Sequence, residues 1–245
     1  MQFSQYNAIA RMEAKNWWYA GRRDLLELLL VQHKKFECAL DVGCGTGSNL
    51  EVISRHSKKS HGIDYSPKAI QYCRKKGFRN LHQMDAQHLG FNAGMFDLVV
   101  CTDVLEHLDD KRAISEFSRV MRKGGLLILA VPAHKYLWND NDDISSHKRR
   151  YEKERILELL APHFKISKLS YWNFLSYFPA LLIYNLKRLF GSQSGKSTGR
   201  KQNNLSLAPS ILSPFLLSML KLENRLFNTI PMPQGVSIIA VATKK

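Results

Sequence analysis

The sequence has few cysteines, few acidic residues near its C-terminal end and no long apolar run. Its four cysteines form no Cys-x-x-Cys pair and no zinc-ligand spacing, which argues against a zinc-binding or disulfide-framework domain. The uncharged stretch 171–186 has 16 residues and contains a proline, whereas a helix needs roughly 20 residues to span a bilayer. The first residues lack an apolar signal run, so we expect a cytoplasmic protein.

Acidic residues are scarcest in the C-terminal part of the chain. Residues 171–245 contain nine Lys and Arg but one acid, Glu223, whereas residues 1–170 contain 27 basic and 20 acidic residues. The net charge of +15 is therefore concentrated at the C-terminal end. Such a surface suits an anionic membrane, nucleic acid or an acidic substrate. A solvated basic face without a partner is the alternative.

Glycines alternate in the segment 41–47, which reads Asp-Val-Gly-Cys-Gly-Thr-Gly. The apolar residues before it predict a buried strand, and residues 48–53 after it predict a helix. Because glycine adopts positive φ and lets a ligand approach the backbone, strand, turn and helix form a cradle of the nucleotide-binding type. For this segment alone, a tight turn without a ligand is the alternative. The candidate cofactor-binding residues here are Asp41, Gly43, Gly45 and Gly47.

The spacing of these glycines argues against a dinucleotide. A nicotinamide or flavin site requires Gly-x-Gly-x-x-Gly, and Ser48 stands where the third glycine would be. The carboxylate of Asp41 would repel a pyrophosphate but favour a ligand with an amino group or a sulfonium. The pattern Asp-x-Gly-x-Gly-x-Gly resembles the first motif of class I S-adenosylmethionine (SAM)-dependent methyltransferases. This resemblance implies SAM as the cofactor and S-adenosylhomocysteine as its product.

Further polar residues follow the strands predicted downstream, at 59–64, 80–86, 96–101 and 126–131. Ligands of such parallel sheets bind at the carboxyl ends of the strands. Asp64 lies 23 residues after Asp41, where a βαβ unit places the carboxylate that binds both ribose hydroxyls. The next residue, Tyr65, is placed to stack on the adenine. The resemblance puts Asp85 and Ala86 at the adenine edge, and we add Thr102 after the fourth strand.

The pattern predicts an α/β fold: a Rossmann-like sheet of seven mostly parallel strands with helices on both faces. An N-terminal helix precedes the sheet, and a helical insertion precedes the last strand. The expected divisions are an N-terminal helical segment (1–35), a SAM-binding core (36–171), an apolar and basic helical insertion (172–234) and the last strand (235–245).

The insertion combines two apolar helices, expected at 172–190 and 211–227, with a basic linker at 191–204. Residues 191–197 mimic a Walker A loop, but they have three residues instead of four between the glycines, so we reject a P-loop. Apolar helices with a basic linker are typical of an interfacial membrane lid or of a cap over a hydrophobic substrate. Packing on the sheet edge, or between the copies of a homodimer, is the alternative.

Two tryptophans and an arginine stand in the predicted N-terminal helix, which covers residues 6–33. Neighbouring helical residues point about 100° apart, so we expect one of Trp17 and Trp18 to pack on the domain and the other to line a pocket. Packing of both is the alternative. The pattern Trp-Trp-x-x-x-Arg resembles methyltransferases of the ubiquinone-biosynthesis O-methyltransferase type, which implies that Arg22 holds the SAM carboxylate.

Three residues are candidates for catalysis. Residues 132–151 are expected to form a 20-residue loop that leaves the carboxyl edge of the sheet and roofs the methyl group. It resembles, in His-Lys-Arg-Arg-Tyr, the His-x-Arg-Arg-Tyr signature of a group of bacterial methyltransferases. His107 and His147 are competing bases for a hydroxyl acceptor, since histidine accepts protons near neutral pH. A local hydrogen bond is the other interpretation of His107. Arg150, with Arg149, is expected to bind a phosphate or carboxylate of the acceptor.

We expect no metal ion in the site. Asp103, Glu106 and His107 resemble the metal-binding acids and histidine of some ubiquinone-pathway O-methyltransferases, so a divalent ion is the alternative.

The sequence thus predicts a SAM-dependent methyltransferase with a small hydrophobic or lipid-linked acceptor, O-methylation being favoured. RNA methylation is a rival suggested by the charge, but nucleic acid is less favoured because no RNA-binding module or Asn-Pro-Pro-Tyr-type motif is recognisable. A SAM-binding partner protein without catalysis is the rival from another class. An anionic membrane surface and a second copy of the chain are further candidate partners. The expected location is cytoplasmic, or peripheral at the inner face of the membrane.

Overall fold

The computed structural model describes residues 10, 12, 13, 15–189, 212–227 and 229–245. The predicted linker at 191–204, with its Walker A-like segment, lies outside the described residues. Half of the helix expected at 6–33 is present as α2, Trp17–Leu30, whose N-cap Asn16 accepts a hydrogen bond from the backbone N–H of Trp18. Residues 6–9, 11 and 14 of the expected helix lie outside the described residues.

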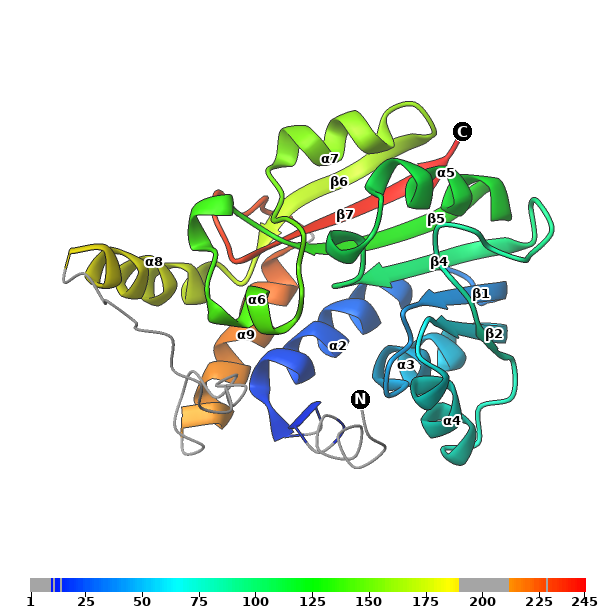
Figure 1. Ribbon diagram of the computed structural model, residues 1–245, viewed down its shortest axis with the longest axis horizontal. Coiled ribbons are helices and arrows are strands. Elements are labelled where there is room, and N and C mark those ends of the chain that lie inside the picture. The colour runs from blue at the N-terminus through cyan, green and yellow to red at the C-terminus, as the bar shows by residue number, and fades with distance from the viewer. Residues whose placement is uncertain (1–9, 11, 14, 190–211, 228) are drawn as a thin grey trace.

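Seven strands form one sheet in the order β3-β2-β1-β4-β5-β7-β6 (Figure 1). Strands β3, β2, β1, β4 and β5 pair in parallel, and β7 runs antiparallel to both β5 and β6. The bounds are β1 Phe36–Val42, β2 Ser57–Asp64, β3 Leu81–Gln83, β4 Phe96–Thr102, β5 Met121–Pro132, β6 Phe164–Trp172 and β7 Ser237–Lys244. This arrangement confirms the predicted α/β fold with a sheet of seven mostly parallel strands.

Helices cover both faces of the sheet (Figure 1). One face carries α2, α3 (Ser48–His56), α4 (Pro67–Lys75) and α9 (Ser213–Phe227), and the other carries α5 (Asp110–Val120) and α7 (Lys153–Leu160). The remaining pieces are η1 (Leu105–His107), η2 (Lys135–Leu137), α6 (Asp140–Ile144) and α8 (Phe174–Leu189), and α8 projects from the body at the left of Figure 1. None of the described helices is both long and apolar enough to cross a membrane.

Strand β5 shows how the core is divided between the two faces. Its residues alternate in direction. Leu127, Leu129 and Val131 pack into the core beneath α5 and α7, while Leu126, Ile128 and Ala130 pack beneath α2 and α9. Because the side chains are apolar on both sides, the strand is covered on both faces, as parallel sheets require.

Two polar residues of α9 fasten the insertion to the N-terminal helix. Asn224 donates to the Gly21 carbonyl and to Asp24 Oδ2, each at 2.8 Å, and accepts from Trp172 Nε1 at 2.8 Å. Glu223 accepts from the backbone N–H groups of Asn173 (2.6 Å) and of residue 174. These buried groups are fully engaged, so α9 and the turn into α8 are held as one unit with α2.

Three local predictions were wrong. The third strand ends at Gln83, and Asp85 lies in the following loop, where its carboxylate accepts from the backbone and side-chain N–H groups of Gln87. Strand β5 begins at Met121 rather than at 126, because Met121 already pairs with Phe96 of β4, before an irregularity in the register between the two strands. The segment 132–151 is not a bare loop, since it contains η2 and α6.

Candidate active site

The glycine turn after β1 is held by hydrogen bonds of its own backbone. The N–H groups of Gly43 and Cys44 both donate to the Ile63 carbonyl at 2.8 Å, and the three glycines of the turn have φ of 73°, 52° and 82°. A Cβ on Gly43 would lie 2.3 Å from Val104 Cγ2, whereas one on Gly45 would meet only a backbone oxygen at 3.9 Å. The turn therefore packs tightly on one side and leaves open space at Gly45, where a ligand can approach the backbone.

Asp64, at the end of β2, braces this turn from the side. Its carboxylate accepts from the backbone N–H groups of Gly45 (3.0 Å) and Ser66 (2.8 Å). Burial raises the pKa of Asp64, and these two hydrogen bonds oppose the rise. A carboxylate has about four acceptor positions, so Asp64 retains capacity for two hydroxyl groups of a ligand.

Arg22 of α2 reaches the same edge of the sheet. Its guanidinium pairs with Asp103, which follows β4 with a φ of 54°, and lies 4.8 Å from the ring centre of Trp18. Burial lowers the pKa of Arg22. Near it, burial raises the pKa of Asp41 to about 7. Arg22 Nε and Asp41 Oδ2 have no hydrogen-bond partner among the described residues, so this edge holds an unused donor and an unused acceptor.

The other predicted cofactor residues line the same row of strand ends. Tyr65 is 79% exposed directly after β2, so its ring is free to stack. Ala86 is buried beside Asp85 in the loop after β3. Thr102, the last residue of β4, accepts a hydrogen bond from Asn49 Nδ2 of α3 at 2.8 Å, which ties that helix to the site. The structure therefore brings the predicted cofactor-binding residues together at one edge of the sheet.

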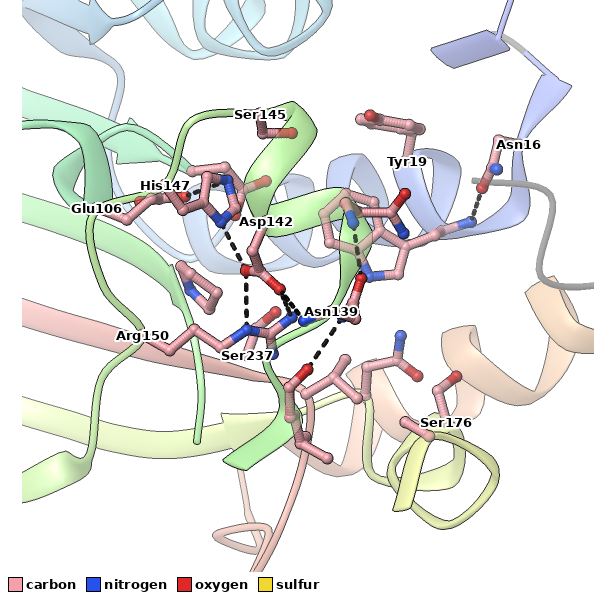
Figure 2. A pocket seen from close by; sticks show the side chains of 18 of the residues that line it. Asn16, Tyr19, Glu106, Asn139, Asp142, Ser145, His147, Arg150, Ser176 and Ser237 are labelled. Carbon is pink, nitrogen blue, oxygen red and sulfur yellow. Dashed lines mark hydrogen bonds and ion pairs between the residues drawn. The ribbon is translucent and has the colours of Figure 1, made fainter. Parts of the chain in front are cut away.

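A cavity of about 340 Å³ lies beyond this edge, enclosed by α2, the segment 132–150 and α8. Figure 2 shows Glu106, Asp142, His147 and Arg150 gathered on one side, with Tyr19 of α2 and Ser176 of α8 across from them. The lining further includes Asn16, Trp17, Trp18, Asp103, His107, Leu137, Asn139, Asn173, Ala180 and Ser237. Both tryptophans line the cavity while packing on the domain, so the expectation that they divide these roles was wrong.

Asp142 organises the polar side of the cavity. His147 Nδ1 lies 2.8 Å from Asp142 Oδ1, and Arg150 donates to both carboxylate oxygens at 2.9 Å (Figure 2). A third Arg150 nitrogen donates to the Ala133 carbonyl at 3.0 Å. Burial would raise the pKa of Asp142, but the hydrogen bonds from His147 and Arg150 lower it to about 2. The carboxylate is therefore charged at neutral pH, and Arg150 is engaged in holding it.

Glu106 and His107 flank His147. Glu106 is fully buried, and neither of its carboxylate oxygens has a hydrogen-bond partner within the described part of the chain. Burial raises its pKa to about 8, and Oε1 lies 3.9 Å from His147 Nε2. His107 Nδ1 lies 3.3 Å from the Ser146 carbonyl, the local contact that its alternative interpretation describes, and burial lowers its pKa. His107 and His147 stand with ring centres 4.9 Å apart.

Glu106, His107 and His147 are also the side chains that could bind a metal ion. Glu106, His107 and His147 bring one ligand atom each to within 4.8 Å of one another. Asp103, which the resemblance included in such a set, instead pairs with Arg22.

The cavity residues that the sequence analysis did not single out for this site are Asp142, Glu106 as a buried acid, and Asn173. Asn173 is 1% exposed with a φ of 62°, and its Nδ2 has no hydrogen-bond partner among the residues described. For Asp142, the run of Asp and Asn at 139–143 could have indicated a polar site. Nothing in the sequence distinguished Asn173 from a surface asparagine.

The residues at the strand ends fit SAM. Its methionine part carries one carboxylate and one ammonium group, matching the unused Arg22 donor and Asp41 acceptor. The open approach at Gly45 and the remaining acceptor capacity of Asp64 suit an adenosine with two ribose hydroxyls.

Known proteins resemble the chain over this region. Residues 40–129 match the family described as "Methyltransferase domain". A ubiquinone biosynthesis O-methyltransferase of Coxiella burnetii is 28% identical over 133 residues, covering 48% of this chain and 57% of that protein. A probable tRNA methyltransferase 9B of Mus musculus is 30% identical over 132 residues, covering 52% of this chain and 27% of that protein. The chain thus spans less than two thirds of the length of either curated relative.

Among solved structures, the N-methyltransferase NodS from Bradyrhizobium japonicum, in complex with S-adenosylhomocysteine, has the same fold. It matches with a TM-score of 0.52 at 23% identity, covering 67% of this chain and 88% of that chain. The match identifies residues 40–129 as a methyltransferase domain, and the likeness to the solved structure shows that the chain has the fold of SAM-dependent methyltransferases.

Proposed function

We propose that the protein transfers the methyl group of SAM to a hydroxyl group of a small hydrophobic or lipid-linked acceptor. The observation that carries this proposal is the cavity beside the cofactor edge. Its wall of Trp17, Trp18, Leu137 and Ala180 suits an apolar body, and its polar residues are gathered around Asp142. Ligand sites of this composition bury an apolar ligand and orient it by a few polar contacts.

In this proposal the strand ends hold the cofactor. Arg22 and Asp41 bind the carboxylate and the ammonium group of the methionine part, and Asp64 binds the ribose hydroxyls. Tyr65, Asp85, Ala86 and Thr102 surround the adenosine, and the turn at Gly43, Gly45 and Gly47 lets it approach the backbone. When bound, SAM supplies a methyl group already activated by its positively charged sulfur, so the protein's main task is alignment.

A hydroxyl acceptor must also lose a proton, and His147 is placed to take it. The carboxylate of Asp142 accepts from Nδ1, which leaves the lone pair of Nε2 for the acceptor. Arg150 fixes Asp142 in turn, so we assign it a positioning role in place of direct contact with the acceptor. His107 is the second candidate base, because it stands beside His147 at the cavity wall.

RNA methylation is the competing acceptor class, favoured by the net charge of +15 and by the name of the mouse relative. A SAM-binding protein without catalysis is the competing class outside enzymes. In that case S-adenosylhomocysteine binds while His107 and His147 are dispensable.

One labelling experiment separates these candidates. The full chain is incubated with SAM carrying a radiolabelled methyl group in an extract of its source cells, with a His147→Ala variant as the matched control. Label then partitions into organic, aqueous and acid-precipitable fractions. Label in the organic fraction that requires His147 supports the proposal. RNase-sensitive label in the precipitate would overturn the acceptor class, and no label in any fraction would favour the partner protein.

A further inference from the structure

Helix α8 presents two faces of opposite character. Ser176 and Ala180 line the cavity, so the face turned toward the protein is small and partly polar. Leu175, Phe178 and Leu182 are 41%, 52% and 59% exposed. At 100° per residue these three fall within about 60° of one another, on the side opposite the cavity. A surface helix of a globular protein normally has the opposite arrangement, with its apolar side chains facing the core and its polar side chains facing solvent.

Helix α9 carries a second exposed apolar stripe. Its inner face is anchored by Leu220, Asn224 and Phe227, all buried. On its outer face Phe215, Leu222 and Leu226 are 62%, 59% and 41% exposed. Their spacing of seven and then four residues aligns them along one side of the helix. Both helices lie at the same end of the molecule (Figure 1), and Glu223 of α9 accepts from the backbone at the start of α8, so the two exposed stripes belong to the same end of the protein.

The charges beside these stripes have one sign. Lys221 and Arg225 are exposed on α9, next to the stripe. The one acid in residues 171–245 is Glu223, which is 5% exposed and accepts from the backbone at the start of α8. Apolar side chains flanked by Lys and Arg are the composition of a helix lying in the interface of an anionic bilayer. A second copy of this chain would bring basic groups against basic groups, which opposes association.

We propose that the outer faces of α8 and α9 form a membrane-binding surface that rests on an anionic lipid bilayer. The surface consists of Leu175, Phe178, Leu182, Phe215, Leu222 and Leu226, with Lys221 and Arg225 beside it. Resting on the function proposed above, this placement brings the cavity wall formed by α8 next to the lipid that contains the acceptor.

Vesicle flotation tests the surface without SAM or acceptor. The full chain is mixed with vesicles of phosphatidylcholine plus phosphatidylglycerol, or of phosphatidylcholine alone, at low and high salt. We expect flotation with the anionic vesicles that weakens as salt rises. Replacing both basic residues by the double variant Lys221→Glu/Arg225→Glu lowers partitioning at least about 30-fold, because each basic residue contributes about 1 kcal/mol near an anionic surface.

The apolar side chains are tested by Phe178→Ser/Leu182→Ser and by Phe215→Ser/Leu222→Ser. Each pair lowers partitioning by at least about tenfold, because apolar area no longer enters the interface. The matched control is Leu157→Ser on α7, an equally exposed leucine (44%) on the other face of the sheet, and it leaves flotation unchanged. Binding of S-adenosylhomocysteine, measured by calorimetry, stays the same in all variants and shows that they are folded.

Three results would overturn the membrane-binding surface. They are absence of flotation at low salt, flotation that the Leu157→Ser control reduces as much as the test variants, and a dimer that dissociates when Phe178 and Leu182 are replaced while vesicles are not bound. The last would assign the surface to a second copy. The outcome is independent of the methyl acceptor: flotation without label in the organic fraction would leave the surface standing and contradict the acceptor class.

Discussion

The cofactor edge and the cavity lie side by side but are built differently. The edge is shaped by backbone: the N–H groups of Gly43 and Cys44 donate to the Ile63 carbonyl, and Asp64 accepts from two backbone N–H groups. The cavity is shaped by side chains from α2, from the segment 132–150 and from α8, and polar atoms of Glu106 and Asn173 there have no hydrogen-bond partner within the described part of the chain. Substitutions at the edge should therefore change cofactor affinity, and substitutions in the cavity should change turnover.

The largest effect is expected from His147→Ala. Losing a general base lowers kcat by about 10²–10⁴-fold. The affinity for S-adenosylhomocysteine should stay within about twofold of the parent value, because His147 touches the cavity rather than the glycine turn. Single-turnover kinetics with the radiolabelled methyl donor measures the first quantity, and calorimetry measures the second.

His107→Ala is the control for this prediction, with an expected loss in kcat of less than about tenfold.

Asp142→Asn tests the orientation of the base, since an amide can no longer accept from His147 Nδ1 and from Arg150 as the carboxylate does. A larger loss in His107→Ala than in His147→Ala would exchange the two roles.

Asp64→Ala tests the cofactor edge. The variant removes the carboxylate that braces Gly45 and that is proposed to bind the ribose hydroxyls. Losing charge-assisted hydrogen bonds of this kind costs about 2–4 kcal/mol, which weakens the binding of S-adenosylhomocysteine by about 30- to 1,000-fold. Asp140→Ala, an exposed acid of α6, is the control. Unchanged affinity in Asp64→Ala would remove this residue from the cofactor site.

The difference between the two regions also explains how far the sequence could be interpreted. The cofactor edge follows from one contiguous motif and from a fixed spacing to Asp64, because a strand, a turn and a helix are local structures. The third strand was predicted to continue to Ala86, but it ends at Gln83. Asp85 accepts a hydrogen bond from the backbone of Gln87, so the chain turns there.

The cavity could not be assembled in the same way. Arg150 was expected to face the acceptor, but in irregular backbone no periodicity indicates that it pairs with Asp142, eight residues earlier. The segment after α6 covers Glu106: the backbone N–H of Lys148 donates to the Glu106 carbonyl, and His147 stands beside its carboxylate. These tertiary contacts cannot be inferred from sequence spacing. The apolar residues of α8 marked the insertion as unusual, but only the fold places Ser176 toward the cavity and Phe178 toward solvent.

Glu106→Gln is expected to stabilise the protein. The folded-state pKa of Glu106, about 8, lies above the ordinary 4.5, so the parent loses stability as the pH rises between these values. A neutral amide avoids this loss, and the gain in unfolding free energy at neutral pH should be about 1–3 kcal/mol. Urea unfolding at several pH values measures it. The exposed Glu154→Gln is the control, and a gain that does not grow with pH would contradict the prediction.

The smallest effect is expected from Ala180→Leu, which narrows the cavity without touching a polar group. Three additional carbon atoms on the inner face of α8 occupy space in a cavity of about 340 Å³, so the acceptor binds less well. The KM for the acceptor found by the labelling experiment should rise by about 5- to 10-fold, as for one or two methylene groups that no longer fit. Asn185→Leu, an exposed position on the same helix, controls for changes in α8 itself. Since neither variant reaches the strand ends, the affinity for S-adenosylhomocysteine should not change, and a loss of that affinity in Ala180→Leu would mean that edge and cavity are not the separable regions described here.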